Sequence, residues 1–350
     1  MGTGQEADRW SRSVKFDYYL LNTYHPDVDG PAPELYAKWV EQVTLAEQLG
    51  FDCAWFTEHH FGRFGGMLPS PQMLIASLGP QTSRIRLGTA VVLLVMHHPL
   101  LVAEETAMLD NLTNGRLNVG VGRGMPTQPL QLFGTDPATA QHKLEEQVQI
   151  LREAWAGNPL TWEGKYYAWS RPITPMPRPL QQPHPPLWMP ANREPAHARW
   201  IGRNGINLMT VPWLMGFEVT RGIIDAYKEG LREGGHSRDE FDILGYLPIY
   251  VGETPDSATR ESEVYWQGFC NVTDEERGGP MPDRPPCEAL VKDSKLIFGD
   301  AAACRQHIER IRSELDTDRL ALMFHFGGMP QELAIASMRR FAKDVAPSFV

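Results

Sequence analysis

The sequence has few cysteines, and they form no metal-binding or redox pattern. Its 350 residues include four cysteines, which are far apart and contain no C-x-x-C pair: Cys53, Cys270, Cys287 and Cys304. This spacing indicates reduced thiols rather than a disulfide framework or a zinc module.

Long apolar runs are also missing. The first residues, MGTGQEADRWSRS, lack the apolar core of a signal peptide. No later stretch reaches the ~18 consecutive apolar residues that a membrane-spanning helix needs. We therefore expect a cytoplasmic protein with no membrane segment, in which residues 1–13 form a disordered tail.

An excess of positive charge is absent as well. The chain carries 33 Lys and Arg against 43 Asp and Glu, a net charge of -10. Nucleic acids and anionic membranes bind surfaces with a local positive excess, so this balance disfavours both as partners. A small molecule is the expected partner.

From Val14 onward, short β-rich runs alternate with amphipathic helical stretches, which is typical of parallel β/α units. The eight expected strands cover residues 14–21, 51–57, 85–94, 116–122, 186–191, 206–211, 243–251 and 320–326. Eight such units without a linker predict an α/β fold, a (β/α)8 TIM barrel, as a single domain over residues 14–350. A two-domain arrangement of doubly wound sheets remains the alternative.

Two proline-rich stretches interrupt this alternation. Residues 157–185 follow the fourth unit, and residues 273–294, which contain GGPMPDRPP, follow the helix after the seventh strand. We interpret both as insertions in the barrel, after strands 4 and 7. The composition of the second predicts a mobile loop.

In such a barrel the active site lies at the carboxyl ends of the strands. The polar residues that follow strands there are Glu58, His59, His60, His97, His98, Arg123, Asn192, Arg193 and His325. Neighbouring residues on an extended strand point to opposite faces, which argues against metal binding by the adjacent histidine pairs. A single imidazole facing the cavity, suited to proton transfer, is the interpretation we favour, and the other histidines then bond to backbone carbonyls.

The segment GRLNVGVGRGM, residues 115–125, does not have the spacing of a dinucleotide fingerprint. It offers exposed amides and the guanidinium of Arg123, which suit a phosphate. Its small residues, among them Gly122, would let a flat ring lie close to the backbone. A tight turn with a solvent-facing arginine is the alternative.

Four segments in order carry a family resemblance: GFDCAWFTEHHFGRFGG from Gly50, RIRLGTAVVLLVMHHPLLVAEE from Arg84, LDNLTNGRLNVGVGRG from Leu109 and ASMRRFAKDVAP from Ala336. Together they resemble the bacterial luciferase-like flavin-dependent monooxygenases, from about Val14 to Pro347. The resemblance implies a barrel that binds reduced FMN and activates dioxygen as a flavin hydroperoxide. The substrate would be an aldehyde, a ketone or a natural-product intermediate. A separate flavin reductase would supply the cofactor, and a homodimer would form through helices near the second and third strands.

The same resemblance implies roles for particular residues. His59 takes the place of the catalytic histidine, with Glu58 as its neighbour. Ala90 and Val91 fall where the family has a cis peptide that supports the flavin ring, and Arg123 falls on a phosphate-binding arginine. Trp213 matches an aromatic residue of the substrate cavity, where we also expect His325.

The chain departs from the luciferases themselves at three places. Gln141 stands in place of a second phosphate arginine, Pro129 replaces an acidic residue, and Asn192 to Pro195 replace a Glu-Ser pair. Arg193, together with amides of a helix that begins near Glu194, would compensate for the missing charge.

Three other functions stay open. A deazaflavin-dependent oxidoreductase would use the same barrel for hydride transfer, although EHHF resembles the oxygenase branch. A non-catalytic flavin-binding subunit would resemble the inactive chain of heterodimeric luciferases. The third is a metal-dependent hydrolase.

Overall fold

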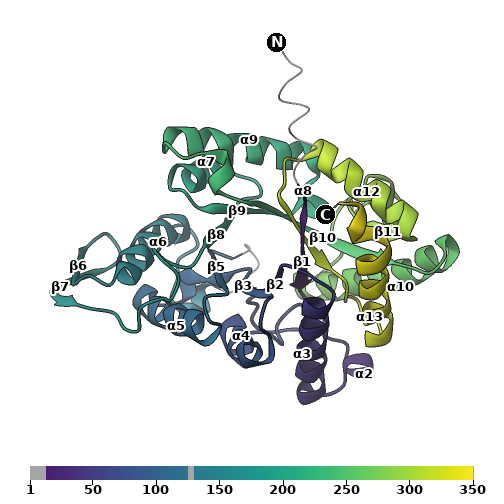
Figure 1. The fold of residues 1–350 in the computed structure, drawn as a ribbon, viewed down its shortest axis with the longest axis horizontal. Coiled ribbons are helices and arrows are strands. Elements are labelled where there is room, and N and C mark those ends of the chain that lie inside the picture. The colour runs from purple at the N-terminus through teal and green to yellow at the C-terminus, as the bar shows by residue number, and fades with distance from the viewer. Residues whose placement is uncertain (1–12, 125–129, 350) are drawn as a thin grey trace, which may run out of the picture.

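Eight parallel strands close into a barrel in the computed structural model, which describes residues 13–124 and 130–349 (Figure 1). In chain order the strands are β1 (Lys15–Leu20), β2 (Cys53–Phe56), β3 (Arg86–Thr89), β5 (Leu117–Gly122), β8 (Leu187–Pro190), β9 (Asn207–Thr210), β10 (Ile243–Val251) and β12 (Arg319–Met323). Strand β10 pairs with both β9 and β12, which closes the ring. The (β/α)8 prediction is confirmed, and the doubly wound alternative is excluded.

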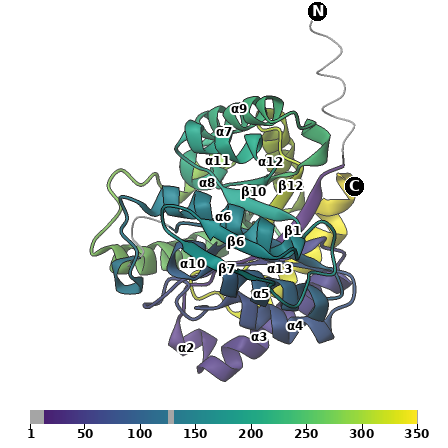
Figure 2. The same ribbon diagram turned by 90° about the vertical axis from the view of Figure 1, so that its left-hand side faces the viewer.

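Helices surround this barrel in both views (Figures 1 and 2). They are α2 (Pro26–Asp29), α3 (Ala32–Gln48), α4 (Pro71–Leu78), α5 (Pro99–Leu112), α6 (Ala140–Ala156), α7 (Pro195–Arg203), α8 (Pro212–Met215), α9 (Phe217–Glu233), α10 (Pro255–Arg277), α11 (Cys287–Lys292), α12 (Ala301–Glu314) and α13 (Gln331–Arg340). In α3, for example, Leu35, Trp39, Val43 and Ala46 recur at helical spacing and are buried. None of the helices in the described ranges is both long and apolar enough to cross a lipid bilayer.

The third strand is shorter than the sequence predicts. The run over residues 85–94 divides into β3 and β4 (Val92–Leu93), which are separated by a cis peptide bond between Ala90 and Val91. Strand β4 continues the contact with β5. The family resemblance implied a cis peptide at Ala90 and Val91, whereas the β-rich composition of the run gives no sign of the break.

The first insertion contains an antiparallel hairpin of β6 (Leu160–Glu163) and β7 (Ala168–Ile173). It stands away from the barrel beside α6 in Figure 1. An insertion after the fourth unit is therefore present, as predicted.

Residues 273–294, which the composition predicted to be a mobile loop, are helical at both ends of the segment. Residues 273–277 complete α10, residues 287–292 form α11, and β11 (Ile297–Gly299) then pairs with the end of β10. Helix α10 continues because Phe269, Cys270 and Val272 keep a buried face. It ends at Gly278, whose φ of 80° is left-handed, before the prolines begin.

The amino end of the barrel contains a buried ion pair. Arg319 donates from Nε and Nη2 to the two carboxylate oxygens of Asp17 at 2.8 and 2.6 Å. Trp55 Nε1 donates to the same carboxylate at 2.8 Å. These contacts join β12, β1 and β2 inside the barrel.

We predict that Arg319→Met destabilises the protein by about 3–5 kcal/mol, because it leaves the Asp17 carboxylate buried without a countercharge. Urea unfolding measures this change. The control is Arg199→Met, which removes an exposed ion pair with Glu229 and should cost less than about 1 kcal/mol. Equal losses in the two variants would contradict the prediction.

Candidate active site

The carboxyl end of the barrel has an apolar floor. Partly exposed Tyr19, Ala90, Val91 and Val211 pack against a buried cluster inside the barrel. The cluster consists of Cys53, Trp55, Trp188, Met209, Leu244, Tyr246 and Ala321. The Tyr19 ring lies 4.3 Å from the Tyr246 ring, centroid to centroid. Ala90 and Val91 were expected here from the sequence, whereas Tyr19 was not, although its place near the end of β1 was the available signal.

Gly122 lets strand β5 approach this floor. A Cβ atom at this position would lie 2.7 Å from Cγ2 of Val91, closer than real Cβ contacts allow. The glycine therefore allows residues 122 and 91 to lie against each other, and the surface between β3 and β5 stays low enough for a flat ring.

Glu58, which follows β2, accepts three hydrogen bonds. Its side chain is 1% exposed. Its Oε1 accepts hydrogen bonds from His60 Nε2 at 2.9 Å and from His97 Nε2 at 2.8 Å, and its Oε2 accepts one from the Leu93 amide at 2.8 Å. Burial acts to raise the Glu58 pKa, but these bonds outweigh it and the pKa is lowered overall. The carboxylate is therefore ionised.

His59 follows Glu58 in the loop after β2 and lies beside an aromatic side chain. Its ring meets the Phe64 ring edge to face at 5.1 Å, and a Cβ atom on Gly65 would come within 2.9 Å of its Cγ. Burial lowers the pKa of His59 to about 4, against the opposing charge of Glu58. At neutral pH the imidazole is therefore uncharged.

A chain of rings connects His59 to Trp213. Phe64 contacts Phe269 at 5.8 Å, and Phe269 stacks on Trp266 at 5.1 Å, while Trp213 meets Trp266 at 5.5 Å. Two of these rings, those of Trp266 and Phe269, come from α10, a helix that was not expected at the site. Arg63 also pairs with Glu275 at the end of α10, so this helix contacts the loop that carries His59.

Arg123 faces the start of helix α7. Its guanidinium forms an ion pair with the Glu194 carboxylate at 2.6 Å. Glu194 is the N-cap of α7 and makes no side-chain capping bond. Pro195 has no N–H, and the His197 and Ala198 amides already donate to the Glu194 carbonyl, so the Ala196 amide is the free donor of this first turn. Together with the Arg123 guanidinium, which already holds a carboxylate, it is suited to a phosphate. These groups fit the phosphate of FMN.

The other residues of this region have separate roles. Asn192 Oδ1 accepts from the Val211 amide at 2.9 Å. Gln141 Nε2 bonds to Glu145 at 2.9 Å and to His197 Nδ1, in the first turn of α7, at 2.8 Å. Arg193 is exposed. Pro129 lies outside the described residues.

His325 lies in the protein interior, 3% exposed. Its Nδ1 bonds to Gln42 Nε2 at 3.1 Å, and its Nε2 bonds to the Met329 carbonyl at 2.7 Å. Because both nitrogens have partners within the protein, this placement speaks against the predicted role in a substrate pocket. His98 is also separate from the site, since its Nδ1 accepts from the Leu100 amide at the start of α5.

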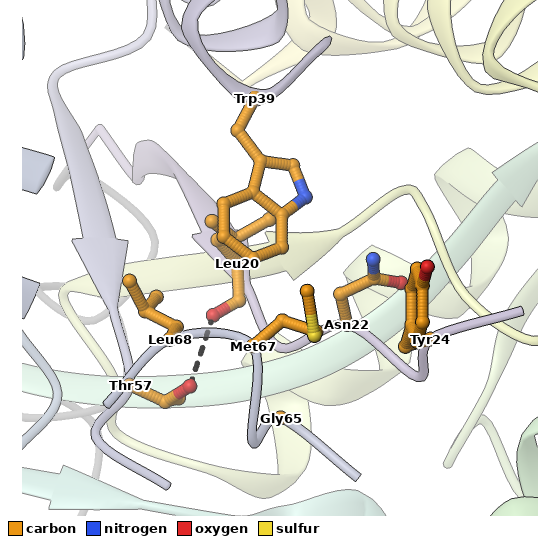
Figure 3. Close-up of a pocket in the computed structure, with 8 residues that line it drawn as sticks. All are labelled: Leu20, Asn22, Tyr24, Trp39, Thr57, Gly65, Met67 and Leu68. Atoms are coloured by element: carbon orange, nitrogen blue, oxygen red, sulfur yellow. Dashed lines mark hydrogen bonds between the residues drawn. The ribbon is translucent and has the colours of Figure 1, made fainter. Parts of the chain in front are cut away.

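A hollow lies between α3 and the loop after β2 (Figure 3). Its empty volume is about 220 Å³, including the part open to solvent. It is lined by Leu20, Asn22, Tyr24, Trp39, Thr57, Gly65, Met67 and Leu68. This lining contains none of the predicted site residues. Over the described ranges, no group of three or more His, Cys, Asp or Glu side chains is arranged to hold a metal ion.

Comparisons with known proteins identify the family of this chain. The sequence profile of the family described as luciferase-like monooxygenase matches residues 14–318. The chain therefore belongs to the luciferase-like monooxygenase family, which confirms the resemblance noted in its sequence and makes it a member of an enzyme family.

Two relatives and one solved structure show the range of this family. The oxygenase component of flavin-dependent trigonelline monooxygenase from Acinetobacter baylyi is 28% identical, over 90% of each chain. The F420-dependent glucose-6-phosphate dehydrogenase of Microbacterium testaceum is also 28% identical, over 87% of this chain and 90% of its own. The crystal structure of monooxygenase RslO1 from Streptomyces bottropensis superposes with a TM-score of 0.90 at 28% identity, over 96% of this chain and all of the other.

Proposed function

We propose that this chain is the oxygenase component of a two-component, FMNH2-dependent monooxygenase that uses dioxygen to oxidise a small organic substrate. The observation that carries the proposal is the Arg123 guanidinium, which holds a carboxylate at the uncapped start of α7 on the side of the apolar floor. A phosphate arm next to a flat apolar surface is what a flavin mononucleotide requires. The substrate would be an aldehyde, a ketone or a natural-product intermediate.

Each group of residues in the site has its own role in this proposed function. Arg123, Arg193 and the first turn of α7 would hold the phosphate, and Ala90, Val91 and Gly122 would support the ring. Asn192 would hold the segment before α7 through its bond to Val211. When bound, reduced FMN supplies the electrons that activate dioxygen. His59, uncharged at neutral pH, would accept or return a proton at a ring nitrogen, while the aromatic side chains from Phe64 to Trp213 would exclude water.

The family supports a reductase as electron source. The trigonelline enzyme is named as an oxygenase component, and no nicotinamide-binding fingerprint was found in this sequence. We therefore propose a separate flavin reductase as partner, and a cytoplasmic location where reduced flavin is available.

A deazaflavin-dependent oxidoreductase is the second candidate, because the F420-dependent relative is as similar as the trigonelline enzyme. Stopped-flow mixing of the protein with reduced FMN or reduced F420, followed by dioxygen and a panel of aldehydes and ketones, separates the two. Our proposal expects ¹⁸O from dioxygen in the product with FMN alone. Turnover with F420 and no oxygen consumption would support the alternative. Flavin binding without turnover of any substrate would support a non-catalytic subunit.

The role of His59 predicts that His59→Ala lowers turnover by a factor on the order of 10² or more. Rates of substrate oxidation measure the change, and circular dichroism checks that the barrel is intact. His98→Ala is the control, because His98 is exposed and bonds to the Leu100 amide at the start of α5. An unchanged rate in His59→Ala removes this residue from the mechanism.

The phosphate site predicts opposite effects of two substitutions. Glu194→Gln should raise the affinity for FMN, because it removes the carboxylate that competes for Arg123, whereas Arg123→Ala should lower the affinity by about tenfold or more. Quenching of FMN fluorescence measures both. Arg193→Ala tests whether Arg193 compensates for the missing phosphate arginine, and an unchanged FMN affinity would show that it does not. The control for Glu194→Gln is Glu229→Gln, which removes a carboxylate that pairs with Arg199 instead.

An exposed apolar stripe supports the proposed homodimer. Leu101, Met108 and Leu112 lie on one face of α5 at 50–54% exposure, and Met73 of the neighbouring α4 is 76% exposed. These are the helices near the second and third strands (Figure 1). Exposed apolar side chains that gather on one face favour association.

We therefore expect Met108→Glu to shift the protein from dimer to monomer in light scattering coupled to size-exclusion chromatography. The control is Val264→Glu, which places the same charge at an exposed apolar position on α10. A dimer that withstands Met108→Glu, or a monomeric wild type, rules out this interface.

A further inference from the structure

The Glu58 carboxylate connects three parts of the chain, two of which the proposed function assigns to the cofactor site. One part is the loop after β2, which carries His59 and through which Glu58 reaches His60. The second is β4, two residues beyond Val91, where the Leu93 amide donates to it. The third is His97 before α5. A change in this one carboxylate would therefore disturb both the His59 loop and the support of the ring.

A buried carboxylate with this role needs a countercharge. Its only ion-pair partners among the residues described are the two imidazoles, and no lysine or arginine pairs with it there. A buried charge without a countercharge costs several kcal/mol in real proteins, so protonation of one imidazole would stabilise this carboxylate beyond its three hydrogen bonds.

The surroundings select His97 as the charged imidazole. The carboxylates of Glu58 and of Glu105, on α5, both favour its positive charge, and burial lowers its pKa less than the bond to Glu58 raises it. Its side chain is 30% exposed, so water can hydrate the charge, whereas that of His60 is 13% exposed and packs against the Phe133 ring at 4.8 Å. Burial and the positive charge of Lys143, on α6, lower the pKa of His98, and this charge is not among those that act on His97.

We propose that His97 is a positioning residue: as an imidazolium it balances the Glu58 carboxylate, and this pair holds the His59 loop and the Val91 segment in register for the cofactor. The sequence alone does not indicate this role, because His97 and Glu58 are 39 residues apart. This proposal rests on the proposed function in one respect only, namely that the segments held by the pair serve a flavin cofactor. The existence of the charged pair can be tested on the protein without cofactor.

The pair has a defined pH window. The pKa of His97 is raised in the folded protein, so its contribution to stability is complete below the ordinary histidine pKa and is lost as the pH rises through the raised value. The pKa of Glu58 is lowered, so its contribution is present above the ordinary glutamate pKa and is lost in acid. The pair is therefore strongest between the ordinary pKa values of glutamate and histidine, and it weakens in alkali.

The test compares wild type with His97→Gln, which keeps an N–H donor for Glu58 but cannot carry charge. The control is His98→Gln, which changes the adjacent histidine without touching Glu58. In thermal unfolding of the cofactor-free protein we expect wild type and His98→Gln to lose about 3 °C more in Tm than His97→Gln between pH 6 and pH 9. FMN affinity should fall severalfold over the same range in wild type and in the control, and stay level in His97→Gln.

A second measurement keeps the proposal testable if the variant folds poorly. Nitrogen-15 NMR of the histidine rings in cofactor-free wild type should show His97 predominantly doubly protonated at pH 6.5, and Glu58→Gln should lower the protonated fraction. A neutral His97 at that pH overturns the proposal.

The outcomes for positioning and for the proposed function are separate. If the charged pair exists but FMN affinity has the same pH dependence in wild type and His97→Gln, the positioning role is wrong and the flavin function stands. If FMN does not bind at all, the proposed function fails, while unfolding and NMR still decide whether the pair exists.

Discussion

The constraint on which the site depends is that eight parallel strands close on themselves. Because every strand runs in the same direction, all eight carboxyl ends meet at one mouth, and the residues that follow them are brought within reach of one another. Closure requires β10 to pair on both sides, with β9 and with β12. The buried pair of Asp17 and Arg319 joins the first strand to the last at the opposite end. The active-site end is thus free to carry polar groups that contribute little to closure.

The mouth combines two kinds of surface. On one side, Ala90 and Val91 lie on a floor of barrel aromatics, where Gly122 keeps β5 close to β3. On the other side, Arg123 and the start of α7 form a site for an anion. Neither surface by itself would indicate a flavin, because apolar floors and exposed arginines are common. Their adjacency, in a member of the luciferase-like family, supports the proposed cofactor.

The histidines show how position in the fold changes the chemistry of one residue type. His59 is partly buried beside the Phe64 ring and uncharged, His97 shares a carboxylate and favours charge, and His325 is fixed between Gln42 and Met329. The three have the same ordinary pKa, and the difference comes from burial and from the neighbouring groups. Helix α10 shows the same dependence on context, because its buried face extends it beyond the point where composition suggested a loop.

The sequence by itself determined the alternation of eight strands and helices, the barrel, and the positions of Glu58, His59 and Arg123 at strand ends. It could do so because periodicity and strand order are local properties, and the barrel places strand ends together whatever the side chains are. Only the tertiary structure decided which groups these residues meet. Arg123 pairs with Glu194, 71 residues away, and Glu58 with His97, 39 residues away. Such partners are selected by the packing of distant segments in three dimensions, which leaves no periodic trace in the chain.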